Sequence, residues 1–247
     1  MALTIYRANQ RTAPAEALKG LDLARKAPLG LVIGSAGTLG APLREKTLGF
    51  ARYLSGIANE ARMTLAFGGV DTDLIRQFSI ARNSGGVTPN TPVLGFAPER
   101  MVSFGCRFEG DDRDIKFPSS AISHLMLLET GSTEKQLMWE ENTGFMFRTI
   151  AEMMEGEASV ASAAFVIGGG KHSAIEVLEA LKLGMPVIAF ADSGRFAENL
   201  CAALGRGREN GTGEDSLQEV LEHRGRIFPF DFFSGRMYAK IKEIFDL

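Results

Sequence analysis

Short runs of apolar residues alternate along this chain with longer segments in which apolar side chains recur every three or four positions. The runs at 29–35, 63–69, 162–170 and 185–193 are nearly continuous in apolar residues, as in strands that are buried on both faces. The segment 41–61, which separates the first two runs, has the spacing of an amphipathic helix. This alternation predicts an α/β fold, with a Rossmann-like, doubly wound, mainly parallel sheet and helices on both faces.

Weaker patterns complete the predicted order of elements. Further strands are expected at 91–98 and 122–130, and further helices at 72–85, 135–156, 172–184, 193–204, 214–223 and 233–246. We expect a single domain over residues 1–247, with its core at about 29–205 and a C-terminal helical extension at about 206–247. The polar segment 99–121 is long for a loop and is either a lid over a ligand or a surface insertion.

Composition limits the classes of function. The net charge is −3, the 27 Lys and Arg residues are spread along the chain, and no apolar run approaches the roughly 20 residues of a membrane span. These features argue against a nucleic-acid partner and against a membrane partner. The start of the sequence lacks a secretory signal pattern, and Cys106 and Cys201 fit reduced thiols in a cytoplasmic protein. Metal-ligand spacing is absent, and we expect neither a metal nor a cofactor.

Four of the predicted strands end in glycine-bearing turns, where sheets of this class bind ligands. The first turn, GSAGTLG, spaces its glycines unlike the dinucleotide fingerprint and lacks the Gly-Lys-Ser/Thr of a P-loop. Such turns either let the backbone approach a phosphate closely or simply start the next helix. Together they favour a phosphorylated or nucleotide-like ligand. The residues expected to line its site are Gly34, Ser35, Thr38, Gly68, Gly69, Asp71, Thr72, Gly168, Gly169, Gly170, Lys171, Ser173, Glu176, Ser193, Gly194 and Arg195.

Several of these residues have a purely structural alternative. Asp71 or Thr72 can cap the helix that follows them. Ser173 and Glu176 have the spacing of a capping box, in which Glu176 would bind the backbone at the start of its own helix. Arg195 is predicted in the first turn of a helix, where a cation is disfavoured. Either a bound phosphate or a carboxylate partner would resolve that conflict.

Three segments resemble proteins of the SLOG superfamily, within roughly residues 29–205. They are GGVDTDLIRQ, SHLMLLETGSTEKQLMWEEN and PVIAFADSGRFAENL, and the match is closest at residues 193–198. The superfamily joins the Lonely Guy (lysine-decarboxylase-like) phosphoribohydrolases to the nucleotide-sensing domains of TRPM channels and their prokaryotic relatives. This chain is most similar to the TRPM-type, or LSDAT, branch. The resemblance implies a Rossmann-like domain that binds ADP-ribose-like nucleotides in signalling.

The hydrolase branch of that superfamily carries the pattern Pro-Gly-Gly-x-Gly-Thr-x-x-Glu. Aligned on Glu176, this chain has Gly168 in place of the proline, His172 in place of the third glycine and Ser173 in place of the threonine. The resemblance would make Glu176 and an upstream arginine catalytic, and Arg148 is the candidate for the arginine. The departures at Gly168 and His172 favour binding over hydrolysis.

Two hypotheses about function follow. In the first, the protein is a sensor that binds a nucleotide-like small molecule, and binding changes either its own assembly, as a dimer or larger homo-oligomer, or the assembly of a partner protein. The helix at 135–156 either supplies the interface of that assembly or faces the core. In the second, the protein is a phosphoribohydrolase that cleaves the glycosidic bond of a nucleoside 5′-monophosphate.

Overall fold

The structure is a computed structural model that describes residues 3–23, 27–34, 37–83, 91–104, 118–155, 160–206 and 215–247. Ser35, Cys106 and most of the segment 99–121 lie outside these residues. The strands are β1 Thr4–Asn9, β2 Leu29–Gly34, β3 Thr64–Gly68, β4 Val93–Pro98, β5 His124–Glu129, β6 Ser162–Ile167, β7 Val187–Phe190 and β8 Ile227–Phe230. The α-helices are α1 Pro14–Gly20, α2 Ala41–Glu60, α3 Asp73–Asn83, α4 Lys135–Met154, α5 Lys171–Lys182, α6 Arg195–Arg206, α7 Asp215–Glu222 and α8 Gly235–Phe245.

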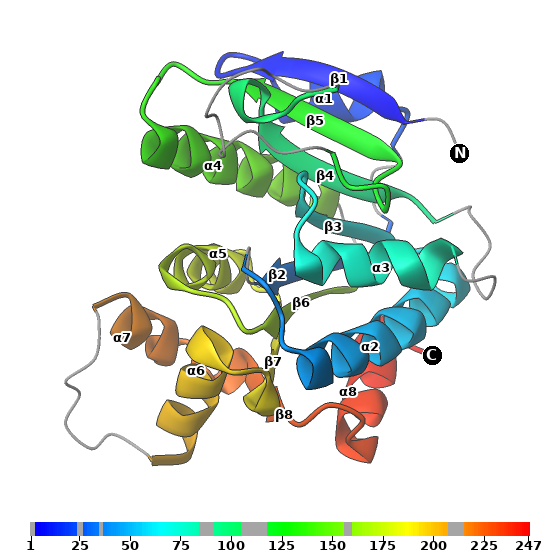
Figure 1. The fold of residues 1–247 in the computed structure, drawn as a ribbon, viewed down its shortest axis with the longest axis vertical. Helices are drawn as coiled ribbons and strands as arrows, with labels where there is room; N and C mark the ends of the chain where they lie inside the picture. Colours follow the sequence, from blue (N-terminus) through cyan, green and yellow to red (C-terminus); the bar gives the residue numbers. More distant parts are fainter. Residues whose placement is uncertain are drawn as a thin grey trace.

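The strands form one sheet in the order β1-β5-β4-β3-β2-β6-β7-β8, and all neighbours run parallel (Figure 1). From β2 the chain builds outward through β3 and β4 to β5, and it then places β6 on the other side of β2. The chain therefore leaves β2 and β6 in opposite directions, with Gly34 in register with Ile167. Ligands bind beyond the carboxyl ends of the strands at such a switch point.

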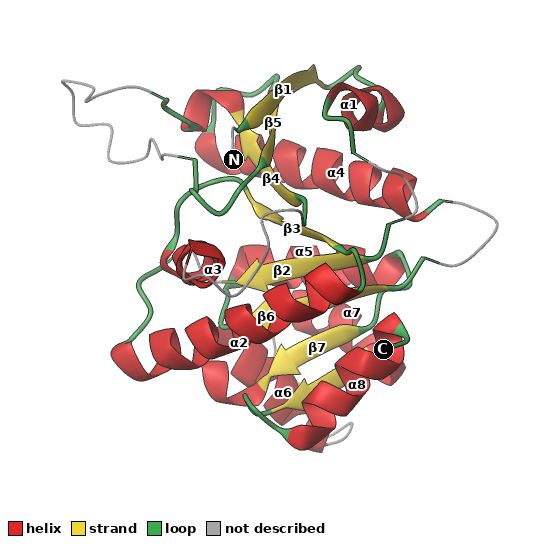
Figure 2. Cartoon of the chain, turned by 90° about the vertical axis from the view of Figure 1, so that its right-hand side faces the viewer, coloured by secondary structure: helices red, strands yellow, loops and turns green. Residues whose placement is uncertain are grey.

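Two layers of helices cover the sheet. One layer contains α1, α4, α5, α6 and α7, and the other contains α2, α3 and α8 (Figure 1). Figure 2 views the molecule from the second layer, with α2 and α8 in front of the strands. Strand residues alternate between the layers, since Leu31 and Ile33 pack in the first layer and Val32 packs in the second. Burial on both faces explains why the central strands are apolar without interruption.

The α/β architecture and the elements between residues 29 and 206 confirm the fold predicted from the hydrophobic pattern. Two predictions near the ends of the chain need correction. Strand β1 and helix α1 precede the expected core, and β1 lies at the edge of the sheet beside β5. The C-terminal region is not purely helical, because β8 pairs with β7 and α8 contributes Met237, Ile241 and Phe245 to the core.

Candidate functional site

The glycine turns after β2 and β6 meet at the switch point. Gly34 is the last residue of β2, and a Cβ there would lie 2.6 Å from the carbonyl oxygen of Ile167. Gly168 and Gly169 have φ angles of 62° and 90°, and a Cβ on Gly169 would lie 2.7 Å from Ser173. Glycine is therefore required at these positions by backbone conformation and close approach. We call the backbone of Gly34, Gly168 and Gly169, which lies beside the start of α5, the floor.

Helix α5 begins directly on this floor. Gly170 is its N-cap, and no side chain caps the helix. The Ser173 hydroxyl accepts a hydrogen bond of 3.3 Å from the Gly170 amide and lies 3.5 Å from the carbonyl oxygen of Gly34. The predicted capping box is therefore misassigned: Ser173 is the third helical residue rather than the N-cap, and Glu176 lies a turn further on, too late to cap. Ser173 instead joins the two turns.

The first amides of α5 are left without protein partners. Within the described residues, no acceptor binds the backbone N–H groups of Lys171, His172 and Ser173. Lys171 itself is exposed and has no ion pair with any described carboxylate. A cation and unpaired N–H groups at the positive end of a helix are mutually unfavourable unless an anion joins them. This end of α5 therefore has the chemistry of an anion site.

The turn after β7 supports the floor from the side. The Ser193 hydroxyl accepts a 2.8 Å hydrogen bond from the Gly168 amide and donates one of 2.6 Å to the carbonyl oxygen of Phe190. Gly194 has a φ angle of 78°, and Arg195 opens α6 as predicted, with an exposed side chain and a φ angle of 56°. Ser193 is thus engaged in positioning Gly168, while Arg195 presents its side chain outward.

The turn after β3 is held mainly by the protein itself. The Thr72 hydroxyl accepts a hydrogen bond of 3.3 Å from the Ile75 amide, which confirms Thr72 as a cap of α3. Asp71 lies 2.7 Å from Arg76 in a salt bridge. Gly68 leaves room at its Cα, whereas a Cβ on Gly69 would lie 2.9 Å from the backbone of Phe96. Gly69 is therefore a packing requirement, and a ligand has little unpaired polar surface to bind here.

Asp73, which the sequence did not single out, connects this turn to the one after β2. Its carboxylate accepts hydrogen bonds from Arg44 at 2.9 Å and from the Leu39 amide at 3.0 Å. It also lies 3.2 Å from Arg76. The hydrogen bond from Arg44 is the largest of the effects that hold the pKa of Asp73 below its usual value. Asp73 thereby fixes the segment before α2, where Thr38 is exposed.

Glu176 and His172 form a polar pair behind the start of α5, in which His172 is the more exposed member. The Glu176 side chain is 19% exposed, and its carboxyl oxygen lies 3.8 Å from Nε2 of His172. Burial raises the pKa of the Glu176 carboxyl to about 8. Burial also lowers the pKa of His172, against a smaller opposing effect of Glu140. Both shifts favour the uncharged form of the side chain, so this contact differs from an ion pair. His172 Nε2 instead has a hydrogen bond of 2.8 Å with the Thr143 hydroxyl.

No curated protein matches this chain significantly. The family described as "SLOG in TRPM, prokaryote" matches residues 27–232, which contain every turn described above. This chain belongs to that family. Among solved structures, it is similar to the X-ray structure of TM1055, a target of the Northeast Structural Genomics Consortium, with 18% sequence identity and a TM-score of 0.51. That alignment covers 87% of this chain and 98% of TM1055 and shows a shared fold.

The SLOG chain also has a groove beside the floor, between α4 and α5. Its volume is about 320 Å³, and its lining includes Thr143, Arg148, His172 and Glu179. The Arg148 guanidinium lies 5.7 Å from the centroid of the Phe145 ring. Arg148 therefore shares a groove with His172, which places it on the same side of the sheet as the floor. Sequence patterns could not reveal the Thr143–His172 contact, because it depends on how α4 packs against α5.

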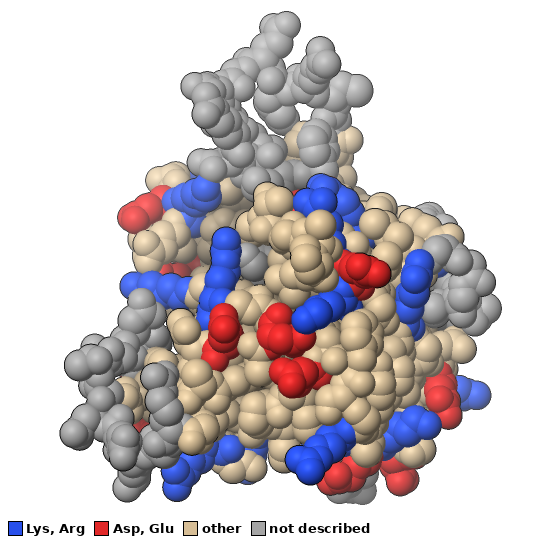
Figure 3. All heavy atoms as spheres, turned by 60° about the horizontal axis from the view of Figure 1, so that its bottom comes forward, with Lys and Arg blue, Asp and Glu red and all other residues tan. Residues whose placement is uncertain are grey.

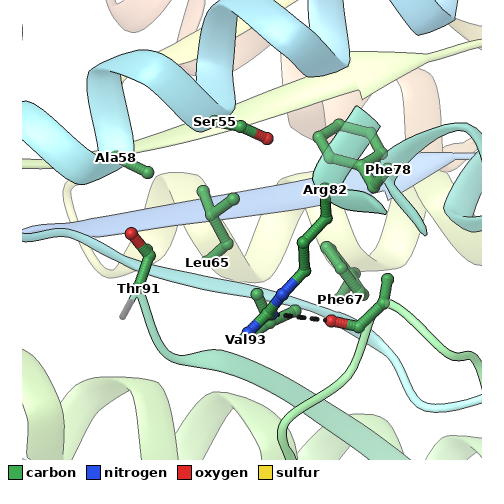
Figure 4. Close-up of a pocket in the computed structure, with 9 residues that line it drawn as sticks. Ser55, Ala58, Leu65, Phe67, Phe78, Arg82, Thr91 and Val93 are labelled. Carbon is green, nitrogen blue, oxygen red and sulfur yellow. Dashed lines mark hydrogen bonds between the residues drawn. The ribbon is translucent and has the colours of Figure 1, made fainter. Parts of the chain in front are cut away.

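A second cavity of the SLOG chain is too small for a nucleotide. It lies near the amino ends of β3 and β4, with Ser55, Leu65 and Phe78 in its wall (Figure 4). Arg82 extends into it and donates a hydrogen bond of 2.9 Å to the carbonyl oxygen of Ala121. Its volume of about 20 Å³ fits roughly one water molecule. It lies at the wrong edge of the sheet for the ligand site.

Other kinds of site find little support in the part of the SLOG chain that the structure describes. No group of three or more His, Cys, Asp or Glu side chains there could hold a metal ion. No described helix is both long and apolar enough to cross a bilayer. On the face shown in Figure 3, acidic and basic side chains of described residues are interspersed. That face has no continuous basic patch of the kind typical of nucleic-acid interfaces.

Proposed function

We propose that this SLOG protein binds a nucleotide or nucleotide-derived ligand of the ADP-ribose type, with a phosphate group on the amino end of α5. The observation that carries the proposal is the set of unpaired amides of Lys171, His172 and Ser173 at the switch point, together with the unpaired Lys171 side chain. The family and the fold support a nucleotide-related function at this edge of the sheet.

A phosphate would supply what each of these groups lacks. Hydrogen bonds to a charged group contribute roughly 1.5–3 kcal/mol each, and a bound anion also removes the conflict between Lys171 and the helix dipole. Gly170 allows the ligand to approach, because it has no side chain and nothing lies within 4 Å of the place where a Cβ would be. The rest of the ligand would extend over the turns after β2 and β7, towards the exposed Thr38 and Arg195.

As part of this proposal, the protein acts as a sensor. Ligand binding would couple Gly34, Gly168 and the turn after β7, because Ser173 and Ser193 already connect them. The response would pass to a homo-oligomer or to a separate protein. Sedimentation velocity of the protein with and without ligand tests this part, and an unchanged distribution of species would limit the response to a separate partner.

Isothermal titration calorimetry tests the binding directly. The ligands are ADP-ribose, cyclic ADP-ribose isomers, NAD and AMP, each added to folded protein. We expect at least one to bind and Lys171→Ala to weaken it by about tenfold. Lys242→Ala is the matched control, because Lys242 is an exposed lysine in the last turn of α8. Absence of binding by every ligand, or equal effects of the two substitutions, would contradict the proposal.

A second candidate function is hydrolysis of the glycosidic bond in a nucleoside 5′-monophosphate. The observation that favours it is the uncharged Glu176, whose pKa is raised by burial to about 8 and which therefore can donate a proton near neutral pH. In this reaction the bond from C1′ to the base breaks and the base leaves with a proton from Glu176. Water adds its hydroxyl group to C1′, and the proton that it releases returns to Glu176. Chromatographic detection of free base from AMP tests it. Release at the same rate by Glu176→Gln would exclude Glu176 from this role.

A further inference from the structure

Strand β1 lies at one end of the sheet, so only one of its two edges pairs with another strand (Figure 1). The Thr4 amide donates a 2.9 Å hydrogen bond to the carbonyl oxygen of Ser123, which turns the main-chain groups of Thr4 towards β5. The main-chain groups of successive residues in a strand point to opposite edges. Those of Ile5 and Arg7 therefore point away from β5, and no residue in the described part of the chain binds them.

This free edge lacks the features that usually protect an edge strand, such as short length, proline or an unpaired charge. The opposite edge of the sheet has two of them, since β8 is four residues long and contains Pro229. Strand β1 has six residues without proline or glycine, and Leu3 and Ile5 beside its free edge are each 36% exposed. Its charged residue, Arg7, lies 2.6 Å from Glu99 in a salt bridge. The edge is therefore suited to pairing with another strand.

The free edge has a defined end at Asn9. The Asn9 amide donates a 2.9 Å hydrogen bond to the Thr12 hydroxyl, and its carbonyl oxygen accepts one of 3.0 Å from the Thr12 amide. Asn9 is thus closed to a further strand, and the groups that remain belong to Leu3, Ile5 and Arg7. These residues are spaced evenly about Ile5. A second copy of the chain, related by a two-fold axis at Ile5, would present the same groups in matching positions.

We propose that two copies of this protein pair through their β1 strands in antiparallel orientation, with Ile5 of one copy opposite Ile5 of the other. Leu3 of each copy then faces Arg7 of the other, and each facing pair exchanges its N–H and C=O groups. The two Ile5 side chains become direct cross-strand neighbours. A register centred on Tyr6 would instead place Leu3 opposite Asn9, whose main-chain groups are taken. A register centred on Arg7 would oppose like charges.

This inference goes beyond the proposed ligand site and does not depend on it. In the sheet, β5, β4 and β3 separate β1 from β2, and the switch point lies on the far side of β2. The dimer should therefore form without ligand. One pair of short strands is small against the roughly 1,200–2,000 Å² that a stable interface buries. We expect a weak dimer, with a Kd between about 1 μM and 1 mM.

Sedimentation of the full chain without ligand, at concentrations across that range, tests the dimer. Ile5→Lys places like charges opposite one another at the two-fold axis and should raise the Kd at least about tenfold. Ile80→Lys is the matched control, because Ile80 on α3 is also an exposed isoleucine, with an exposed fraction of 42%. The control should leave the Kd unchanged. Should Ile5→Lys not fold, Ile5→Pro removes the edge-facing amide and leaves the hydrogen bonds to β5 in place.

Amide hydrogen exchange on the same proteins locates the contact. Exchange in β1 should slow as the concentration of wild-type protein or of Ile80→Lys rises, and it should stay fast in Ile5→Lys. A wild-type protein that remains monomeric across the range would overturn the proposal. So would a dimer that both substitutions weaken equally. Slow exchange in β1 of a monomer would assign the edge to another segment of the same chain, which would also overturn it.

Discussion

The substitution Gly170→Asp separates the stability of α5 from ligand binding. Gly170 is the N-cap of α5, its φ and ψ angles of −149° and −157° suit any residue, and a Cβ there meets no atom within 4 Å. An aspartate at this position can accept hydrogen bonds from the amides of His172 and Ser173. The aspartate would then supply, as part of the protein, the anion that we propose comes from the ligand.

The expected effect on the unliganded protein is a gain in stability. Aspartate exceeds glycine as an N-cap by a few tenths of a kcal/mol, and its charge near the positive end of a helix adds about 0.3–1 kcal/mol. The free energy of unfolding should rise by about 0.5–1 kcal/mol. In a chain of 247 residues this corresponds to a rise in melting temperature of roughly 1–4 °C.

The expected effect on ligand binding has the opposite sign. The carboxylate would take two amides that each contribute roughly 1.5–3 kcal/mol to an anionic ligand, and it would repel that ligand. Nucleotide affinity should fall by at least about 100-fold. Calorimetry and thermal unfolding on the same samples measure the two effects. Ala13→Asp, at the uncapped and exposed start of α1, is the control that should gain stability without losing affinity. A stabilised Gly170→Asp with unchanged affinity would refute the placement of the ligand on α5.

Two further predictions concern buried titratable groups. The Glu176 carboxyl has a pKa of about 8 against 4.5 when unperturbed, so the folded state binds this proton more tightly and loses stability as the pH rises through that interval. Between about pH 5 and 8, the free energy of unfolding of Glu176→Gln in urea should therefore rise relative to that of the wild-type protein, by up to about 1.4 kcal/mol per pH unit. The same pH dependence in both proteins would contradict this. Burial raises the pKa of the Cys201 thiol to about 11, so iodoacetamide should modify Cys201 far more slowly in folded protein than in urea. Peptide mass spectrometry distinguishes modification of Cys201 from modification of Cys106. Equal rates of Cys201 modification in folded protein and in urea would contradict the prediction that the fold shields this thiol.

The hydrophobic pattern was sufficient for the central strands but not for the edges of the sheet. Strands such as β2 and β6 are buried on both faces, so they appear as continuous apolar runs that stand out from the helices around them. Strand β1, TIYRAN, is mostly exposed at the edge and has no such run. Strand β8, IFPF, is four residues long and contains a proline, which is tolerated at an edge strand. Both strands lie at an edge of the sheet and are only partly buried, so neither has the long apolar run of a central strand.

The candidate site, like the fold, could be predicted only in part from the sequence. Its glycines follow directly from strand ends, so the turns that hold Gly34, Gly168 and Gly194 could be predicted as local features. Contacts between distant elements could not, because nothing in the sequence near Thr143 indicates that α4 approaches α5 at His172. The capping box was misassigned because its spacing is correct, but the helix begins two residues earlier than Ser173.

The residues at the start of α5 differ from those at the start of α3, a helix that follows another strand of the same sheet. Thr72 caps α3 with its hydroxyl, and Asp73 places a carboxylate in its first turn, so the protein supplies its own anion there. Helix α5 instead has a glycine at the cap, which offers no capping side chain, and the cation Lys171 as its first residue. This difference occurs beside the switch point, where topology alone predicts a ligand. A helix that needed only to fold would be better served by the residues of α3, so the residues at the start of α5 are best explained by an anion that comes from outside the chain.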